Sequence, residues 1–166
     1  MTSRYETPDI VVRTGVTDDL FAIEGLWHAL YEHQKAHGMF LEVSPNSFTD
    51  WTDSMKVSLG RFTFLVVAEF RGQMIGFVAG RVKSLPPYFG GFTVGFIGEV
   101  FVSETHRKNG LAREMLDLAT EWFSTQRVHR IELQVLLDNN AARQVYRELG
   151  WKEELVQMVW ELPINK

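Results

Sequence analysis

The stretch that decides the fold is Arg107-Lys108-Asn109-Gly110-Leu111-Ala112, a basic turn that contains one glycine. It follows an apolar run at residues 97–102 and precedes an amphipathic pattern that begins near Gly110. This order predicts a strand, a turn and then a helix. The start of a helix carries free N–H groups and the positive end of the helix dipole, so we expect the turn to hold an anion such as a phosphate. Gly110 would let such a ligand approach the backbone, because it has no Cβ.

The segments after this turn extend the pattern. Apolar residues recur at helical spacing and predict a helix with one buried face, which carries Leu111, Met115, Leu116, Ala119, Trp122 and Phe123. Residues 131–136 then form another apolar run, which predicts a strand. A strand, a helix and a further strand in this order favour a right-handed crossover between two parallel strands.

The rest of the chain is typical of one α/β domain spanning residues 1–166, built around a mixed sheet. Two β-rich runs flank Arg71-Gly72-Gln73, which predicts a hairpin, and a loop with two prolines and two glycines follows them. The further elements expected from periodicity and capping are strands at 10–13, 62–70, 74–82 and 156–162, a helix that begins near Asp18 and ends before Gly38, and helices at 47–59 and 140–149.

The amino-acid composition limits the range of possible functions. The 166 residues are 45% hydrophobic and 23% charged, and they carry a net charge of −4. An acidic balance argues against broad binding to nucleic acid and mildly favours a cationic substrate. The chain has no cysteine, which excludes disulfides, thiolate metal ligands and a cysteine nucleophile. Its apolar stretches are too short to span a bilayer and its first residues lack a signal sequence, so a cytoplasmic protein without a membrane partner is expected.

A second motif lies about thirty residues after the basic turn. Residues 139–151 fit the pattern Asn-x-x-Ala-x-x-x-Tyr-x-x-x-Gly-aromatic, with Asn139, Ala142, Tyr146 and Gly150 at the defining positions. Together with the strand residues 100–102 and the turn itself, this motif resembles the GNAT family of N-acetyltransferases. The order of elements along the whole chain also resembles that fold.

The resemblance implies a mixed central sheet of about six to seven strands, splayed between the fourth and the fifth, with about four flanking helices. It also implies acetyl-coenzyme A as the donor. The strand segment Val100, Phe101 and Val102 would pair with the pantetheine arm of the coenzyme. The pyrophosphate would lie on the turn and the first helical residues, which are Arg107, Lys108, Asn109, Gly110, Leu111, Ala112 and Arg113. Asn139 matches an asparagine that contacts the coenzyme, although Asn140 could take this place and either residue could simply cap the helix.

Two residues are candidates for catalysis. Tyr146 matches the tyrosine that, in the family, protonates the departing thiolate in a direct transfer without a covalent intermediate. An attacking amine must first lose a proton, and Glu99 is the candidate base because it interrupts an apolar run, where burial would raise its pKa. Glu99 could instead bind the substrate ammonium group, or it could lie on a solvated face of the strand. The strand N–H near Val102 would stabilise the oxyanion.

The acceptor is less well determined. In the family the acceptor pocket is usually built from the first two helices and the loop before the fourth strand. Here these regions carry Trp27, His28, Tyr31, Glu32, His33, His37, Phe40, Glu42, Trp51, Tyr88 and Phe89. This mixture suits a small cationic primary amine such as a polyamine, an aminoglycoside-like molecule or an amino-acid derivative. Trp27 and Tyr31 also share the apolar face of a helix, which favours core packing for them.

Several alternatives stay open. The acceptor could be a protein N-terminus or a lysine, or the chain could be an inactive coenzyme A sensor or interaction module, although such a module would not need Tyr146. A Rossmann enzyme is disfavoured because the turn contains a single glycine. No metal site is expected, since the histidines have no cysteines or clustered carboxylates of matching geometry around them. The resemblance also allows a homodimer, although no interface can be identified from the sequence.

Overall fold

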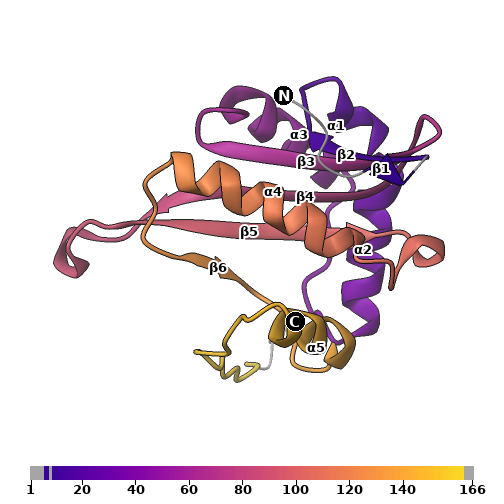
Figure 1. Cartoon of the computed structure of the whole chain (residues 1–166). Coiled ribbons are helices and arrows are strands. Elements are labelled where there is room, and N and C mark those ends of the chain that lie inside the picture. The colour runs from indigo at the N-terminus through magenta and orange to yellow at the C-terminus, as the bar shows by residue number, and fades with distance from the viewer. Residues whose placement is uncertain (1–5, 8, 163–166) are drawn as a thin grey trace.

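A six-stranded mixed sheet forms the centre of the computed structural model, which describes residues 6, 7 and 9–162 (Figure 1). The strands lie side by side in the order of the chain, and only the last pair is parallel. Their bounds are β1 (Glu6–Thr7), β2 (Ile10–Thr14), β3 (Thr63–Phe70), β4 (Gln73–Ser84), β5 (Thr93–Val102) and β6 (Ile131–Leu133). The mixed α/β sheet agrees with the expectation from the sequence, but the strand count is slightly lower than expected, because one of the six is the two-residue β1, which was not predicted.

Five α-helices occur in the described chain, one more than expected, because the predicted first helix is broken at Ile23. They are α1 (Asp19–Ala22), α2 (Glu24–Ala36), α3 (Ser47–Ser58), α4 (Leu111–Thr125) and α5 (Asn140–Glu148). Two short 3₁₀ helices, η1 (Pro87–Phe89) and η2 (Glu104–His106), lie in the loops on either side of β5. None of the described helices is both long enough and apolar enough to cross a membrane.

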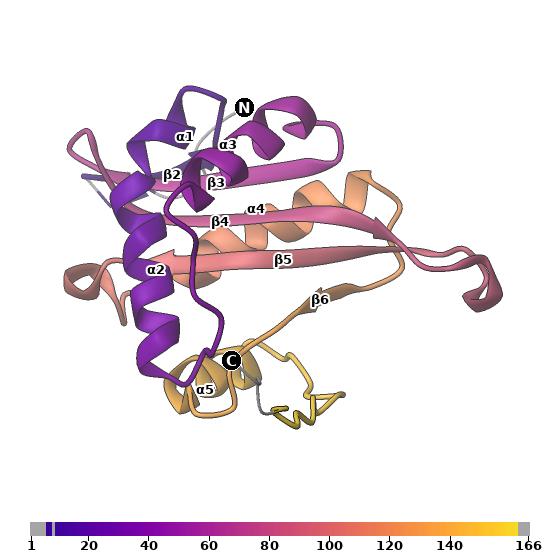
Figure 2. The same cartoon turned by 180° about the vertical axis from the view of Figure 1, so that it is seen from behind.

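The sheet separates two hydrophobic cores. Helix α4 covers one face, where its apolar stripe packs on Ile97 and Val102 of β5. Helices α1 to α3 cover the opposite face, where Trp27, Phe48 and Met55 pack on Phe101 and on neighbouring strand residues. Figures 1 and 2 show these two layers from opposite sides. Because consecutive strand residues point to opposite faces, β5 supplies side chains to both cores.

The last predicted strand, at 156–162, is absent from the structure. Residues 151–162 carry no regular secondary structure, and the predicted strand at 131–136 is reduced to the three residues of β6. Residues 156–162 do alternate in a strand-like manner, but a strand needs a partner for its N–H and C=O groups. Neither side of the segment 156–162 meets a strand within the described chain, so its local propensity is not sufficient.

Candidate active site at the opening of the sheet

The sheet opens between β5 and β6. These two strands pair only from Gly95 and Ile131 to Ile97 and Leu133, and beyond this point β5 continues for five residues without β6 beside it. When the two-residue β1 is left out of the count, β5 and β6 are the fourth and fifth strands, so the predicted splay between these two strands is present. It leaves the backbone of residues 98–102 unpaired along the edge that faces β6, where an extended ligand could add to the strand.

A β-bulge lies at the same point. Ala79 of β4 pairs with Glu99, whereas the next residue, Gly80, pairs with Ile97, so that Gly98 is the extra residue on β5. Residue 80 has no room for a side chain, because a Cβ at this position would lie 2.4 Å from the carbonyl oxygen of Phe96. An extra residue in one strand reverses the direction of the side chains that follow it.

The bulge decides where Glu99 points. Ile97 belongs to the core under α4, whereas Ala79 and Phe101 belong to the core under α1 to α3. Glu99 is paired with Ala79 and lies two residues from Phe101, so its side chain faces the layer of α1 to α3. Without the bulge, strict alternation from Ile97 through Gly98 would direct Glu99 under α4. An isolated glycine inside a strand run is a known sign of a bulge, and here it is the signal that could have predicted this direction.

Glu99 sits in a desolvated position. It is half-buried, and burial raises the pKa of its carboxyl group to about 7, while a hydrogen bond from the side chain of Trp51 and the charge of Arg81 act in the opposite direction. Burial and the nearby charge of Glu99 raise the pKa of Tyr31 to about 12. A carboxyl group with a pKa close to 7 can take up and release a proton near neutral pH. The sequence patterns did not indicate Arg81 as a residue of the candidate site.

Aromatic rings gather on the same face as Glu99. The ring of Trp27 lies 4.3 Å from that of Tyr31, 5.5 Å from that of Phe48 and 6.2 Å from that of Trp51, measured between centroids. Trp27 is buried, as its place on the apolar side of α2 predicted. Its indole Nε1 is buried without a hydrogen-bond partner among the described residues. The floor of this region is therefore apolar and aromatic, with the Glu99 carboxyl group as an acidic group beside it.

The basic turn has the geometry expected of an anion site. Helix α4 begins at Leu111, directly after Gly110, whose φ of 78° is the left-handed conformation that glycine adopts without strain. The first N–H inside the helix to find a backbone acceptor is that of Glu114, which donates to Gly110. Within the described chain, the four N–H groups from Gly110 to Arg113 have no acceptor. They are available to a phosphate at the end of the opening.

The side chain of Arg107 binds the end of β5. Its Nε donates to the carbonyl oxygen of Val102 at 2.9 Å, and its guanidinium lies 5.4 Å from the centroid of the Phe101 ring. The side chain thus ties the turn to the end of β5. Lys108 and Asn109 are exposed.

Tyr146 lies on α5, the helix that follows β6 along the chain. Tyr146 is half-buried and packs against the core under α4, and its ring centroid lies 6.1 Å from that of Trp151. Burial raises the pKa of its hydroxyl group to about 12, so the phenol stays protonated at neutral pH. Asn139 is the N-cap of α5, because its side chain accepts a hydrogen bond of 3.1 Å from the N–H of Ala142. Asn140 is the first residue of the helix.

Some of the predicted acceptor residues lie elsewhere. Tyr88 and Phe89 are exposed in η1, at the start of β5, whereas α2 and the end of β5 lie at the opposite end of the sheet (Figures 1 and 2). Phe40 and Glu42 are exposed in the loop before α3. Among residues 6, 7 and 9–162, no three histidine or acidic side chains gather as they would around a metal ion.

The family can now be stated. Residues 23–151 match the model of the acetyltransferase (GNAT) family, which is more than half of the chain. The chain therefore belongs to this family of acetyltransferases, as its two motifs indicated.

The individual proteins that the chain resembles share only a small part of its sequence. The chain is 30% identical over 100 residues to an L-2,4-diaminobutyric acid acetyltransferase of Halomonas elongata, and the match covers 60% of this chain and 46% of that protein, less than half of its length. The fold is similar to that of the aminoglycoside N-acetyltransferase AAC(6')-Iy in complex with CoA, with a TM-score of 0.75, 15% identity and coverage of 92% of this chain and 94% of the other. It is also similar to a tetramutant of the BH1408 protein from Bacillus halodurans, with a TM-score of 0.76, 20% identity and coverage of 92% and 99%.

Proposed function

We propose that this protein transfers an acetyl group from acetyl-coenzyme A directly to the primary amine of a small cationic molecule. Three features of the opening and of the elements around it support the proposal. These are the unpaired edge of β5, the free N–H groups of α4 at one end of it, and a proton acceptor and a proton donor from different elements, Glu99 and Tyr146.

The coenzyme would lie between β5 and β6. Its pyrophosphate would accept hydrogen bonds from the N–H groups at the start of α4, and the amides of its pantetheine arm would pair with Val100, Phe101 and Val102. This fits the structure because, within the described chain, no strand pairs with residues 98–102 on the side that faces β6, and the N–H groups from Gly110 to Arg113 have no acceptor. The other edge of β5 is paired with β4, and the carbonyl oxygen of Val102 accepts a hydrogen bond from Arg107. Asn139, which closes the first turn of α5, would support the coenzyme indirectly by holding that helix in place.

The chemistry would be a single acyl transfer. Glu99 in its ionised form accepts a proton from the substrate ammonium group, either directly or through water, and the neutral amine attacks the thioester carbonyl carbon. The N–H of a residue near Val102 stabilises the oxyanion of the tetrahedral intermediate. When the bond between carbon and sulfur breaks, Tyr146 donates its hydroxyl proton to the thiolate. As the amide forms, its nitrogen loses a second proton to water. Glu99 then releases its proton and Tyr146 regains one through solvent, so each turnover releases one proton in total.

A small cationic acceptor is supported by the surroundings of Glu99. Aromatic faces attract ammonium groups, and a carboxylate at the end of an aromatic floor would orient one of them. The relative from Halomonas acetylates diaminobutyric acid by its name, and one fold neighbour is an aminoglycoside acetyltransferase by its title. Both names refer to acceptors that carry amino groups, which is consistent with the proposal.

The test is to incubate the protein with acetyl-coenzyme A and a panel of amines, and to measure thiol release and the acetylated product. The panel would contain diamino acids, polyamines, aminoglycosides and peptides with a free N-terminus or a lysine. We expect turnover with at least one small diamine or polyamine. Turnover with peptides alone would overturn the acceptor class. Coenzyme binding without turnover on any amine would support a sensor instead, and a lack of coenzyme binding would contradict both.

A further inference from the structure

The layer of α1 to α3 covers only part of its face of the sheet. On β4, Phe77 and Ala79 are fully buried beneath this layer, whereas Arg81 and Lys83, farther toward the tip of the hairpin between β4 and β5, are exposed. Figure 2 shows α2 across the far ends of the strands and no described helix in front of the halves of β4 and β5 next to the hairpin tip. Glu99 pairs with Ala79, so it lies at the border between the covered and the open part of this face.

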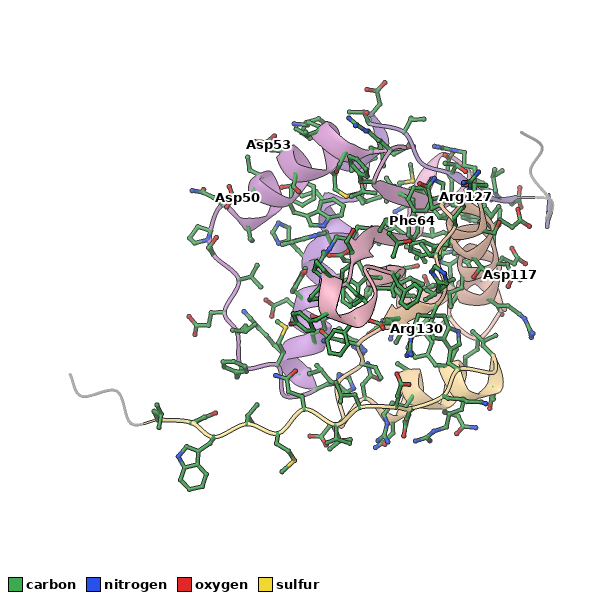
Figure 3. All side chains as sticks on the ribbon, turned by 90° about the vertical axis from the view of Figure 1, so that its left-hand side faces the viewer. Asp50, Asp53, Phe64, Asp117, Arg127 and Arg130 are labelled. Carbon is green, nitrogen blue, oxygen red and sulfur yellow. The ribbon has the colours of Figure 1, made fainter. Side chains whose placement is uncertain are left out.

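The two exposed cations lie on the same side of the sheet as Glu99. Val82, which stands between them in the sequence, packs against the core under α4. Because consecutive strand residues point to opposite faces, Arg81 and Lys83 face the other layer. Figure 3, which views the sheet from the hairpin tip, shows α4 on one side and α2 and α3 on the other. The cations therefore belong to the face on which we place the acceptor.

Both cations lie over one aromatic ring. The guanidinium of Arg81 is 5.0 Å and the Nζ of Lys83 is 5.9 Å from the centroid of the Phe96 ring. Neither side chain forms an ion pair or a hydrogen bond with a described residue. Glu132 of β6 is paired with Phe96 in the sheet, but its carboxylate lies 3.2 Å from the Nε of Arg130. Two like charges on one ring repel each other, and a bound anion would relieve this repulsion.

Arg81 and Glu99 are spaced for a short molecule that contacts both. Arg81 lies two residues from Ala79, the partner of Glu99, so the two residues are diagonal neighbours on adjacent strands. Side chains at such positions start roughly 7 to 8 Å apart. They form no ion pair with each other, although the charge of Arg81 opposes the rise that burial causes in the pKa of Glu99. A molecule that carries a carboxylate and an amine a few bonds apart has the length to bridge these two groups.

The two cations are distant from the phosphates of the coenzyme in the proposed function. The pyrophosphate would lie on the N–H groups that follow the end of β5 at Val102. Phe96 precedes Val102 by six residues in the same strand, which corresponds to about 20 Å. An anion held over Phe96 would therefore belong to the acceptor and not to the coenzyme.

We propose that Arg81, with Lys83 beside it, binds a carboxylate group of the acceptor and so selects an amino acid with a second amino group in its side chain. A guanidinium can hold a carboxylate through two parallel hydrogen bonds. The amine of the acceptor's side chain, several bonds from the carboxylate, then reaches Glu99. A simple diamine has no anion to offer, and Arg81 and Lys83 repel it. This carboxylate site rests on the proposed acetyl transfer, for which it names the class of acceptor.

Pairs of acceptors that differ in the carboxylate alone test the site. L-2,4-diaminobutyric acid is compared with diaminopropane, ornithine with putrescine and lysine with cadaverine, each with acetyl-coenzyme A. We expect kcat/KM of at least one amino acid to exceed that of its diamine by at least about 10², mainly through a lower KM. Turnover of all three diamines with equal or higher efficiency would overturn the carboxylate site and leave the acetyl transfer intact.

The variant Arg81→Gln identifies the residue. It should reduce the ratio of kcat/KM between amino acid and diamine by at least about tenfold, and Arg81→Glu should favour the diamine. Loss of the charge also acts on Glu99, but this affects both acceptors alike and cancels in the ratio. Arg71→Gln is the matched control, because Arg71 also lies 5.0 Å from a ring centroid, that of Phe70, in the turn before β4. A ratio that is unchanged in Arg81→Gln, or that falls equally in Arg71→Gln, would contradict the assignment.

Binding measurements separate the carboxylate site from the proposed function. In calorimetric titrations of the complex with coenzyme A, the preferred amino acid should bind the wild type at least about tenfold more tightly than its diamine, and Arg81→Gln should lose this preference. If no amine is acetylated but this preference in binding is found, the acetyl transfer is refuted and the carboxylate site stands. If neither binding nor turnover distinguishes the amino acids from their diamines, the carboxylate site is refuted.

Discussion

The guanidinium of Arg107 donates a hydrogen bond to the carbonyl oxygen of Val102, so the first residue of the basic turn is tied to the last residue of β5. The bond spans 2.9 Å, and the same guanidinium lies over the ring of Phe101. The turn is thus held against the strand before any ligand arrives. This arrangement assigns Arg107 a positioning role and leaves the N–H groups that follow it to bind an anion.

Replacing Arg107 by Ala should therefore lower stability even without coenzyme. Loss of a partly buried bond from a charged group is expected to reduce the free energy of unfolding by about 1 kcal/mol. Lys108→Ala is the matched control, because Lys108 is exposed and should change stability by less than about 0.5 kcal/mol. Urea denaturation of both variants measures this. If Arg107→Ala keeps full stability but loses coenzyme affinity, the guanidinium contacts the phosphates directly.

Replacing Gly110 by Ala should weaken coenzyme binding beyond its cost to folding. The left-handed φ of 78° strains an alanine by about 1 kcal/mol, and the new methyl group would stand where the pyrophosphate approaches. Gly72→Ala separates the two effects, since Gly72 has a φ of 81° and, like Gly110, has no atom within 4 Å of the added Cβ. Calorimetric titration with coenzyme A should show at least about a tenfold weaker affinity for Gly110→Ala alone, a loss of about 1.4 kcal/mol. Equal affinities would argue against a phosphate at this turn.

Replacing Tyr146 by Phe should remove the proton donor and keep the packing. We expect kcat to fall by about 10² to 10³, whereas the dissociation constant of coenzyme A changes by less than about threefold. Folding should be unaffected, because the hydroxyl group has no hydrogen-bond partner among the described residues. Thiol release and coenzyme titration measure the two quantities. A variant with unchanged kcat would show that the thiolate leaves without help from this residue.

Replacing Glu99 by Gln should change the pH profile of the reaction. With a pKa of about 7, Glu99 is protonated in acid, so kcat/KM of the wild type should rise with pH and level off above about 7. The variant should instead rise continuously as the amine itself loses its proton. The ratio of kcat/KM of the wild type to that of the variant should be largest near pH 7 to 8, on the order of 10², and should decrease toward pH 10. Parallel profiles would exclude Glu99 as the base.

The same variant should alter stability in a defined direction. The folded protein holds the proton of Glu99 up to a pKa of about 7, whereas the unfolded chain releases it near 4.5. The free energy of unfolding of the wild type, relative to Glu99→Gln, is therefore highest below pH 4.5, falls as the pH rises to about 7 and is constant above that. Partial exposure limits the total loss to about 2 kcal/mol. Denaturation curves at pH 4.5, 6 and 8 that keep a constant difference would refute a buried, neutral Glu99.

Much of the fold could be predicted because its signals are local. The basic turn before α4 presents its own backbone N–H groups, and Asn139 caps α5 with its side-chain oxygen, so the geometry of both follows from neighbours in the chain. The face to which Glu99 points depends instead on the register between β4 and β5, where Gly98 is an extra residue. Register is a property of two strands, so periodicity in one of them does not reveal it.

The prediction of a last strand at residues 156–162 was wrong for a related reason. Residues 156–162 have the alternation of a strand, and their propensity was read correctly, but a strand forms only where an edge is available in the right direction. Here no strand of the described chain lies beside residues 156–162. Such a partner is a property of the tertiary structure and cannot be assigned from the local sequence. The distant position of Tyr88 and Phe89 likewise follows from the length of the hairpin between β4 and β5.

The central claim is that the opening between β5 and β6 holds the acyl donor, with Tyr146 at its sulfur. The most direct measurement is a crystal structure of the protein with bound coenzyme A. The account predicts the pyrophosphate on the N–H groups from Gly110 to Arg113, the pantetheine arm along residues 100–102 and the sulfur within hydrogen-bond distance of the Tyr146 hydroxyl group. A coenzyme bound outside this opening, or a sulfur far from Tyr146, would contradict it.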